Sequence, residues 1–332
     1  MCGVKFGIAG YGGRGKVIAR KLADLGAEVT GVYDSNPAQL VGAPFRTFSD
    51  LDSLFELDLT ALAVATWPSS HAKIAEAALE RNLDVFVEKP MGSAIGESLR
   101  IVEAQKRSGR LVVVGYVERL NPAIMKLRDM ADLDDVVRSR EIRIGLTPPG
   151  KSGPGVLLDL ASHGLDMAYH LFHAEPRIRS ATLTVGQEGK PEYECMVEFD
   201  CNRTRCFVEA RHAGIRRRRL ELETEQEYFE VTYTPAQLKI GFPPPKLRTR
   251  PRSFEDLEQL SKSVETSFEV PRKEPINTML QLSIESFRKG SVIDPLCSGE
   301  QALVTAKAID EAKRMATYRF LVRQVSESKH HN

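Results

Sequence analysis

The 332-residue sequence lacks an excess of charge of either sign: Lys and Arg number 46 and Asp and Glu 45, a formal net charge of +1. General nucleic-acid binding needs a basic surplus to displace counterions from phosphates, so this balance argues against that class of protein. Low net charge with 42% hydrophobic residues also excludes extensive disorder. No apolar run reaches the roughly 20 residues of a membrane span, and the apolar stretch within residues 1–9 is too short for a secretory signal.

Cysteine is scarce as well, with five residues and no Cys-x-x-Cys pair. This usage fits a reducing compartment, and we expect a cytoplasmic protein. Cys195, Cys201 and Cys206 lie close in sequence, but no His accompanies them at metal-ligand spacing. We therefore interpret them as strand residues and expect no metal site.

The first third of the chain alternates short apolar runs with helical patterns, which is typical of βαβ units and a parallel sheet. The pattern predicts strands over 4–9, 29–33, 60–65, 84–87 and 111–117, and helices over 16–25, 69–81 and 94–108. The nearly continuous apolar run 60–65 predicts a strand that is buried on both faces.

After about Leu120 the pattern changes to strands in series, which implies an antiparallel or mixed sheet. It predicts strands over 139–145, 179–185, 193–199, 205–212, 218–223 and 228–233, and helices over 122–130, 154–172, 276–288 and 300–322. Residues 241–254, rich in Pro and Arg, predict an exposed loop. The length suggests about two domains.

A glycine-rich segment follows the first expected strand and opens the first expected helix. It matches the pattern Gly-x-Gly-x-x-Gly and consists of Gly10, Tyr11, Gly12, Gly13, Arg14 and Gly15. The first glycine of such a loop permits a tight turn, the second lets the backbone approach a pyrophosphate, and the third lets the helix pack on the strand. Because the helix N-terminus then faces the anion, we expect these residues to bind a dinucleotide.

Asp34 lies at the end of the second expected strand, 19 positions after Gly15, where a dinucleotide-binding fold carries an acid. A carboxylate there accepts hydrogen bonds from the ribose 2′-hydroxyl and repels a 2′-phosphate, which favours NAD over NADP. A turn or capping role in the segment 34–37 is the alternative. With the strand, the glycines and the acid in register, we interpret Asp34 as a cofactor ligand.

At Glu88-Lys89-Pro90 the sequence resembles the glucose–fructose oxidoreductase and inositol dehydrogenase (Gfo/Idh/MocA) family of nicotinamide-dependent sugar oxidoreductases. Residues 155–166 resemble the family's Asp-x-x-x-His helix, and residues 274–276 and 298–300 resemble its C-terminal landmarks. The resemblance therefore spans nearly the whole chain.

This resemblance implies an α/β protein with a particular division into domains. A Rossmann NAD-binding domain is expected over 1–120, and an α+β domain with an open, predominantly antiparallel mixed sheet over 121–298. A C-terminal helix, 299–325, is expected to pack back on the first domain, and 326–332 form a tail.

The resemblance also implies that Lys89, Asp159 and His163 are catalytic and bind the substrate. A neutral imidazole, with an unperturbed pKa of about 6.5, suits removal of a hydroxyl proton, and a lysine ammonium stabilises a developing alkoxide. Asp159 and His163 lie four residues apart, on one helix face, where Asp159 is placed to bind a neighbouring sugar hydroxyl. Asp166, on the same face, either steadies His163 or lies at the surface. The alternative interpretation, which holds if the family motif is set aside, is that His163 is an ordinary helix histidine and Lys89 a solvated lysine at the end of a strand.

Further residues are expected at the carboxyl edge of the parallel sheet, where cofactors lie. They complete the expected cofactor site: Thr66, Trp67, Pro68, His71, Glu88 and Lys89. Trp67 departs from the family, which often has a small residue or proline there, and either stacks near the cofactor or packs locally. The alternative to a cofactor role for His71 is that it begins or caps its helix.

The segment 115–123 resembles the Gly-His-x-Glu-Arg-Phe-Asn-Pro stretch of family members that oxidise C3 of UDP-N-acetylglucosamine, with Tyr116 and Leu120 as departures. This implies a sugar or UDP-N-acetylhexosamine substrate, bound by Tyr116, Arg119 and Asn121 beside the three catalytic residues. The Arg119 guanidinium suits a phosphate or carboxylate, and pairing with Glu118 or another local acid is the alternative. Asn121 is also placed to cap the next helix.

Two basic clusters, Arg216 to Arg219 and the arginines Arg248, Arg250 and Arg252, suit either a diphosphate or a solvated strand edge and loop. Six apolar residues occupy both parities of the second-domain strands: Val197, Phe199, Phe207, Val208, Leu220 and Leu222. They predict a sheet with two apolar faces and hence a homodimer or homotetramer.

Three functions remain open at this point. The first is an NAD-dependent dehydrogenase acting on a hydroxyl of a sugar, a nucleotide sugar or inositol. The second is a non-catalytic sensor of NAD or a sugar, and the third is redox-neutral glycoside cleavage, both of which occur among relatives. Retention of Lys89, Asp159 and His163 favours an enzyme over a sensor, because a sensor needs no base. No nucleic-acid or membrane partner is expected.

Overall fold

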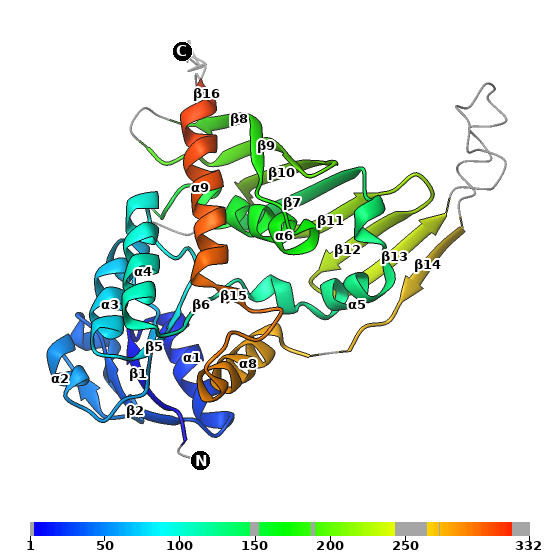
Figure 1. The fold of residues 1–332 in the computed structure, drawn as a ribbon. Helices are drawn as coiled ribbons and strands as arrows, with labels where there is room; N and C mark the ends of the chain where they lie inside the picture. Colours follow the sequence, from blue (N-terminus) through cyan, green and yellow to red (C-terminus); the bar gives the residue numbers. More distant parts are fainter. Residues whose placement is uncertain (1–2, 147–152, 187–189, 243–263, 272, 321–332) are drawn as a thin grey trace, which may run out of the picture.

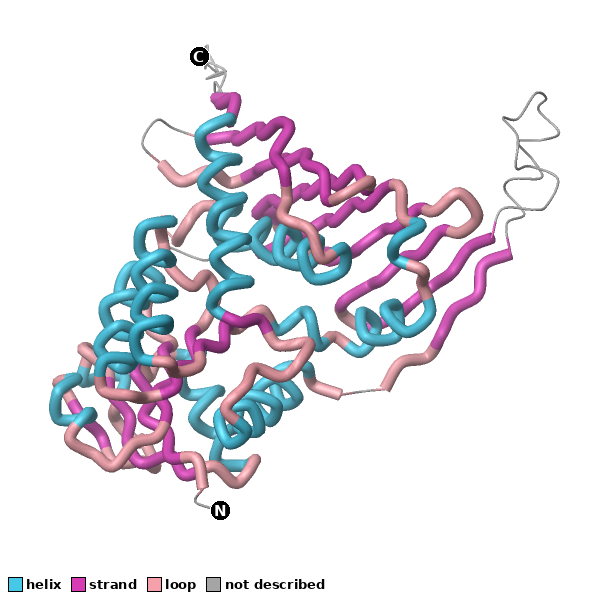
Figure 2. The backbone as a smooth tube through the Cα atoms, in the orientation of Figure 1, coloured by secondary structure: helices cyan, strands magenta, loops and turns pink. Residues whose placement is uncertain are grey.

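The computed structural model describes residues 3–146, 153–186, 190–242, 264–271 and 273–320. Two β-sheets form its framework, one built mainly from the N-terminal third and one from the C-terminal two thirds of the chain, with helices packed between and around them (Figures 1 and 2). The arrangement is the expected one of a Rossmann domain followed by a mixed, mostly antiparallel sheet.

The first sheet has seven strands in the order β15-β6-β5-β4-β1-β2-β3. Their bounds are β1 Lys5–Ala9, β2 Glu28–Tyr33, β3 Thr47–Phe48, β4 Ala61–Val64, β5 Asp84–Val87, β6 Val112–Val114 and β15 Cys297–Ser298. All neighbours are parallel except β15, which runs antiparallel to β6. The strand expected from the apolar run is confirmed as β4, which is buried along its whole length.

Helices cover both faces of this sheet and so bury it. On one face α3 (Pro68–Glu80) and α4 (Ile95–Ser108) share a core with the strands, and on the other α1 (Gly13–Asp24) and α8 (Pro275–Lys289) do. The expected division assigned α8 to the second domain, but the Phe287 ring of α8 lies 6.0 Å from the Phe6 ring of β1. Its helical period indicated an apolar face without indicating which sheet that face covers.

The second sheet has nine strands in the order β14-β13-β12-β11-β7-β10-β9-β8-β16. Their bounds are β7 Arg138–Leu146, β8 Arg177–Val185, β9 Glu194–Cys201, β10 Thr204–Ala213, β11 Arg217–Glu223, β12 Tyr228–Tyr233, β13 Ala236–Phe242, β14 Val264–Phe268 and β16 Ala316–Phe320. The pairs β7–β10 and β8–β16 are parallel and the others antiparallel. The expected mixed sheet is therefore confirmed.

Among the described residues, helices pack on one face of the second sheet and leave the other open (Figure 1). The covering elements are α5 (Pro122–Met130), a π-helical turn η4 (Leu157–Ala161), α6 (Ser162–Phe172) and α9 (Gly299–Met315). Short 3₁₀ turns elsewhere in the described chain are η1 (Pro37–Gln39), η2 (Val117–Leu120) and η3 (Leu133–Asp135). α9 lies between the two sheets, with α4 on one side and α6 on the other. The three cysteines of β9 and β10 are buried free thiols, as expected of strand residues.

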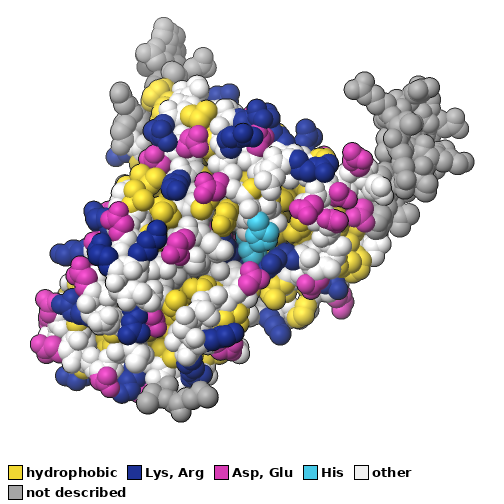
Figure 3. Space-filling model, in the orientation of Figure 1, with side chains coloured by type: hydrophobic (Ala, Val, Ile, Leu, Met, Phe, Trp, Pro, Cys, Tyr) yellow, Lys and Arg dark blue, Asp and Glu magenta, His cyan; other side chains and the backbone are white. Residues whose placement is uncertain are grey.

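The expectation of two apolar sheet faces is wrong. Of the six residues on which it rested, only Phe207 lies on the open face, while the others are buried beneath the helices. The open face carries cross-strand ion pairs instead, such as Arg140 with Glu209 and Arg205 with Glu198. Charged side chains of both signs are also interspersed over the face seen in Figure 3.

Other differences concern single elements. The helix expected over 154–172 is a π turn followed by α6, and the helix expected to reach 322 ends at Met315, where β16 begins. The sequence reading missed β3, β13, β14 and a short helix, α2 (Leu51–Phe55). Residues 243–263 and 321–332, with the basic cluster Arg248 to Arg252 and the expected tail, lie outside the described residues.

Candidate active site

The glycine loop lies at the carboxyl end of β1 and is built by close backbone contacts. Gly10 has a φ of +93°, and a Cβ there would lie 2.7 Å from the backbone of Ala65. A Cβ at Gly15 would lie 1.8 Å from the carbonyl oxygen of Gly10, so only glycine lets α1 start this near the strand. A Cβ at Gly12 or Gly13 would meet nothing within 4 Å, which leaves the loop open on the side away from the sheet.

This loop fits a dinucleotide. The N-cap residue of α1, Gly12, offers no capping side chain, and the first turn has no acidic residue, so its N–H groups are available to a pyrophosphate. Asp34 lies beside them at the end of β2: its Oδ2 accepts from the Tyr11 N–H at 2.7 Å and its Oδ1 from the Asn36 N–H at 2.8 Å. Each oxygen keeps a lone pair for a ribose hydroxyl.

The remaining expected cofactor residues line the same sheet edge, and several of them have structural partners. Arg14 donates from Nε to Oε1 of Glu88 at 2.7 Å, which ties the glycine loop to the segment before Lys89. His71 lies in the first turn of α3, buried, with its ring nitrogens 2.9 Å from the Pro90 carbonyl and 3.1 Å from the Thr66 carbonyl. Trp67 is 60% exposed beside Pro68 at the start of α3, so it is not a core residue.

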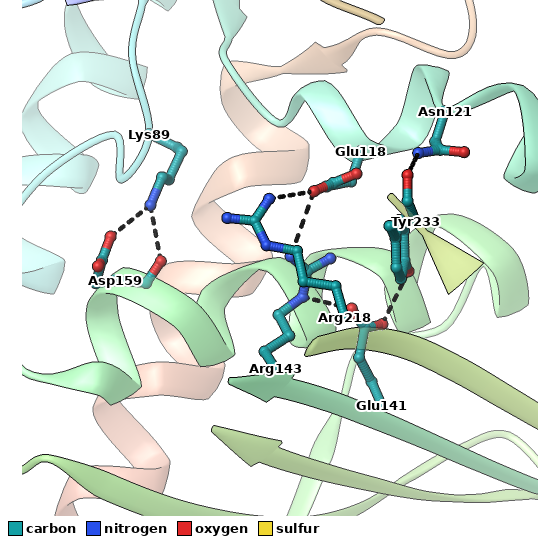
Figure 4. Close-up of polar contacts among 8 residues, drawn as sticks. All are labelled: Lys89, Glu118, Asn121, Glu141, Arg143, Asp159, Arg218 and Tyr233. Carbon is teal, nitrogen blue, oxygen red and sulfur yellow. Dashed lines mark hydrogen bonds and ion pairs between the residues drawn. The ribbon is translucent and has the colours of Figure 1, made fainter. Parts of the chain in front are cut away.

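Lys89 and Asp159 meet although 70 residues separate them in sequence. Lys89 follows β5, its peptide with Pro90 is cis, and its Nζ donates to the Asp159 side-chain Oδ1 and backbone carbonyl, each at 2.7 Å (Figure 4). Two of the three ammonium protons are thereby used, and one is left for a ligand. Asp159 lies in the π turn η4, an irregularity often found at functional sites.

His163, four residues after Asp159, is buried on α6 beneath the edge of the Tyr116 ring, with ring centroids 5.9 Å apart. Its Nδ1 finds no hydrogen-bond partner among the described residues. Burial lowers the pKa of His163 well below its usual value, and the nearby charges of Lys89 and Arg143 lower it further. The ring is therefore a neutral imidazole that can accept a proton.

A buried network of charges beside these residues escaped the sequence analysis. Arg143, 1% exposed on β7, pairs with Glu141 and lies 3.5 Å from Glu118, which also accepts from Arg218 at 3.1 Å (Figure 4). Tyr233 donates to Glu141 at 3.2 Å. Both Arg143 Nη atoms find no hydrogen-bond partner among the described residues. The alternation of apolar and polar residues along a strand predicts that charged residues such as Glu141 and Arg143 are exposed. Their burial became visible only from the structure.

Several further expectations about site residues need correction, beginning with Arg119. Arg119 is 1% exposed and donates to Asp166 from Nε at 2.9 Å and Nη2 at 2.7 Å, and to Gln301 from Nη1. The guanidinium is buried and paired with Asp166 and Gln301, so it is not placed to meet a substrate anion. The alternative of pairing with an acid of the protein holds, with Asp166 rather than Glu118 as the acid. Asp166 is correspondingly neither at the surface nor bonded to His163.

Asn121 and Tyr116 are buried as well. The Asn121 side chain caps α5 by accepting from the Ala123 N–H at 3.0 Å, and it donates to the Tyr233 carbonyl at 3.1 Å. These two bonds support the capping role of Asn121 rather than substrate binding. The basic cluster Arg216 to Arg219 does not act as one unit, because Arg218 turns inward to Glu118 while Arg219 pairs with Glu230 on the open face.

One site residue was missed altogether. His212 on β10 lies with Nε2 3.9 Å from Oδ2 of Asp159 and is 14% exposed. No sequence motif marks it, since its place follows from the register of β10 with β7. Within the described ranges, no group of His, Cys, Asp and Glu is placed to hold a metal ion, and no helix is long and apolar enough to span a membrane.

Comparison with known proteins supports this description. Residues 4–116 match the family model described as an oxidoreductase family with an NAD-binding Rossmann fold. The chain is 32% identical over 189 residues to inositol 2-dehydrogenase of Acidothermus cellulolyticus, covering 52% of this chain and 55% of that protein. It is 28% identical over 180 residues to UDP-N-acetylglucosamine 3-dehydrogenase of Acidithiobacillus ferrooxidans, covering 53% and 56%. The matched segments thus span about half the length of these curated relatives.

Solved structures extend the likeness in fold to the second domain. UDP-N-acetylglucosamine 3-dehydrogenase from Acidithiobacillus ferrooxidans superposes with a TM-score of 0.81 at 19% identity, covering 95% of this chain and 98% of that one. A 3-ketoreductase from Actinomadura kijaniata, in complex with NADP and TDP-benzene, superposes with a TM-score of 0.80 at 14% identity, covering 97% and 100%. Residues 4–116 are therefore similar to the Gfo/Idh/MocA family of oxidoreductases, and the likeness to these solved structures extends in fold over nearly the whole chain.

Proposed function

We propose that the protein is an NAD-dependent oxidoreductase that removes a hydride from a secondary hydroxyl of a sugar or nucleotide sugar. The observation that carries this proposal is the pairing of a charged donor with a neutral acceptor. Lys89 Nζ is held by two hydrogen bonds to Asp159, and burial keeps the pKa of His163 low, so that its imidazole is neutral and able to accept a proton. Alcohol oxidation requires such a pair.

The chain's own residues then divide the work. Lys89 hydrogen-bonds the reacting hydroxyl oxygen with its remaining N–H and stabilises the alkoxide as it forms, while His163 takes the proton. Asp159 fixes the Lys89 ammonium and orients the sugar through an adjacent hydroxyl. When bound along the glycine loop, NAD supplies the hydride acceptor at the carboxyl edge of the sheet.

NAD rather than NADP is the proposed cofactor, since the Asp34 carboxylate lies beside the Tyr11 N–H, where the ribose is expected. The family description names NAD, and the Actinomadura ketoreductase holds NADP. Dissociation constants of both dinucleotides, measured for the wild type and Asp34→Ala, test this. We expect wild type to prefer NAD and the variant to lose that preference; a wild-type preference for NADP contradicts the proposal.

For the substrate we propose C3 of a UDP-linked N-acetylhexosamine, on the strength of the 115–123 segment and the likeness to a UDP-N-acetylglucosamine 3-dehydrogenase. Inositol or a free sugar is the second candidate, supported by the likeness to inositol 2-dehydrogenase. A cofactor-reduction screen with UDP-N-acetylglucosamine, its uronic acid, myo-inositol and simple aldoses separates the two. Turnover of a free polyol or monosaccharide without turnover of any UDP-sugar overturns the first.

We also retain self-association and a cytoplasmic location as proposals. The open face of the second sheet offers the half-buried Phe207 and Met196, which is 50% exposed, between its ion-paired side chains as a contact surface for a second copy. Light scattering at micromolar concentration is expected to give a dimer or tetramer, and a monomeric mass contradicts this. Free buried thiols at four described cysteines are compatible with a reducing compartment.

A further inference from the structure

We propose that His212 is a specificity-determining residue, which binds, together with Asp159, the hydroxyl next to the one that is oxidised. This inference rests on the proposed function. It concerns a residue that no motif in the sequence marks and that lies on the sheet of the second domain, opposite the π turn.

The two oxygens of the Asp159 carboxylate have different surroundings. Oδ1 accepts from Lys89 Nζ at 2.7 Å, whereas Oδ2 forms no hydrogen bond among the described residues and points toward His212, with 3.9 Å to Nε2. That separation is too long for a direct hydrogen bond. It suits a single oxygen about 2.8 Å from each group, which donates to the carboxylate and accepts from the imidazole N–H.

A sugar hydroxyl is both donor and acceptor and therefore satisfies both groups at once. Because Lys89 and Asp159 are in contact, the hydroxyl bound by Lys89 and the one bound between Asp159 and His212 must be neighbours in the substrate. The pair thus selects vicinal diols, and it rejects analogues in which the second hydroxyl is missing or substituted.

The sheet holds His212 rigidly in this position. Its backbone is paired with Gly145 on β7, and its N–H donates to the Tyr193 carbonyl at 2.9 Å. A Cβ at Gly145 would lie 3.7 Å from Cδ2 of His212, an ordinary van der Waals distance, so the imidazole ring lies close beside this position of β7. A group fixed by a strand is better preorganised for recognition than one on a loop.

The test compares a substrate with its analogue lacking the neighbouring hydroxyl. For UDP-N-acetylglucosamine oxidised at C3 this probe is the 4-deoxy compound, and for another substrate found in the screen it is the corresponding vicinal deoxy analogue. Wild-type kcat/KM is expected to fall roughly 10-fold or more on the deoxy probe, the loss typical of a hydrogen bond to a charged group. His212→Ala is expected to lower kcat/KM by a similar factor on the full substrate and little further on the deoxy probe.

Matched variants separate recognition from folding. His212→Gln keeps an N–H donor and is expected to recover part of the discrimination, and Arg211→Ala, the exposed next residue on the opposite face of β10, is expected to leave both substrates unaffected. Equal losses on both substrates in His212→Ala, or no loss on either, overturn the proposal. Absence of wild-type turnover on every sugar instead refutes the proposed function, and the His212 proposal falls with it.

Discussion

At the scale of single residues, some site residues could be identified from sequence motifs and others only from the contacts in the folded structure. The motif resemblance brought Lys89, Asp159 and His163 to attention, and the structure places them together. His212 and Arg143 could not be found in this way, because they lie on strands where alternation alone decides inside from outside. Arg119 was misread, since its partner Asp166 lies 47 residues away in sequence.

The glycines of the loop differ in what they do, and this can be measured. Gly15→Ala is expected to lower the thermal stability of the cofactor-free protein, because its Cβ would lie 1.8 Å from a backbone oxygen. Gly12→Ala is expected to leave that stability nearly unchanged, since its Cβ meets nothing within 4 Å, and to weaken NAD binding by obstructing the pyrophosphate. Calorimetric melting and NAD titration check both; unchanged NAD affinity in Gly12→Ala argues against the assigned phosphate site.

The pH dependence of catalysis follows from the low pKa of His163. Burial favours the neutral ring, so a base with this pKa is already unprotonated at pH 6.5 and gains protons only in more acidic solution. The ascending limb of kcat/KM should therefore lie below pH 6.5, with a plateau at neutral pH. His163→Ala should lower kcat by roughly 10²–10⁴-fold and abolish the limb. If His163→Ala instead keeps a near-wild-type kcat and the ascending limb of kcat/KM, His163 is not the base and Lys89 becomes the candidate.

At the scale of elements, most helices and strands were predictable and their ends and partners were not. The apolar run of β4 and the series β9 to β12 follow directly from periodicity. The π turn in the segment 154–172 was not predictable, because periodicity does not distinguish it from an α-helix. β16 was read as helix because its residues continue the apolar pattern of α9, whereas its actual pairing, parallel to β8, is a long-range contact.

Close packing of α6 on the sheet sets the position of His163. A Cβ at Gly164 would lie 2.7 Å from Val208 of β10, so Gly164→Ala should push α6 outward, cost about 1–3 kcal/mol of unfolding free energy, and lower kcat. Gly96→Ala in the first turn of α4 is the control, because a Cβ there meets nothing within 4 Å. Urea unfolding with parallel kinetics measures this, and equal behaviour of the two variants contradicts it.

At the scale of the whole molecule, the two domains are joined by buried polar contacts as well as by the chain. Arg119 of η2, Asp166 of α6 and Gln301 of α9 meet where the two sheets approach each other. The two-domain division was predictable from the change in pattern near Leu120. The return of α8 and β15 to the first sheet was not predicted, because the expected division assigned residues 121–298 to the second domain and returned only 299–325 to the first.

Removing one partner of this buried pair leaves an uncompensated charge. Arg119→Met is therefore expected to cost about 3–5 kcal/mol of unfolding free energy, and Arg119→Met/Asp166→Leu much less than twice that. Arg128→Met serves as control, since its partner Asp294 is 70% exposed and such pairs contribute only about 0–1 kcal/mol. Urea unfolding measures these free energies. A loss of unfolding free energy in Arg119→Met that is no larger than in Arg128→Met contradicts the proposed contribution of the buried pair to stability.

The central claim, that Lys89 and His163 oxidise a sugar hydroxyl at the edge of the NAD site, is tested most directly by the rate of NAD reduction in Lys89→Met. The substrate is the one that the screen identifies, and Lys106→Met, at an exposed position in the last turn of α4, is the control. The account predicts a fall in kcat of roughly 10²–10⁴-fold in Lys89→Met at saturating NAD, and wild-type rates in Lys106→Met. Wild-type turnover by Lys89→Met would contradict it.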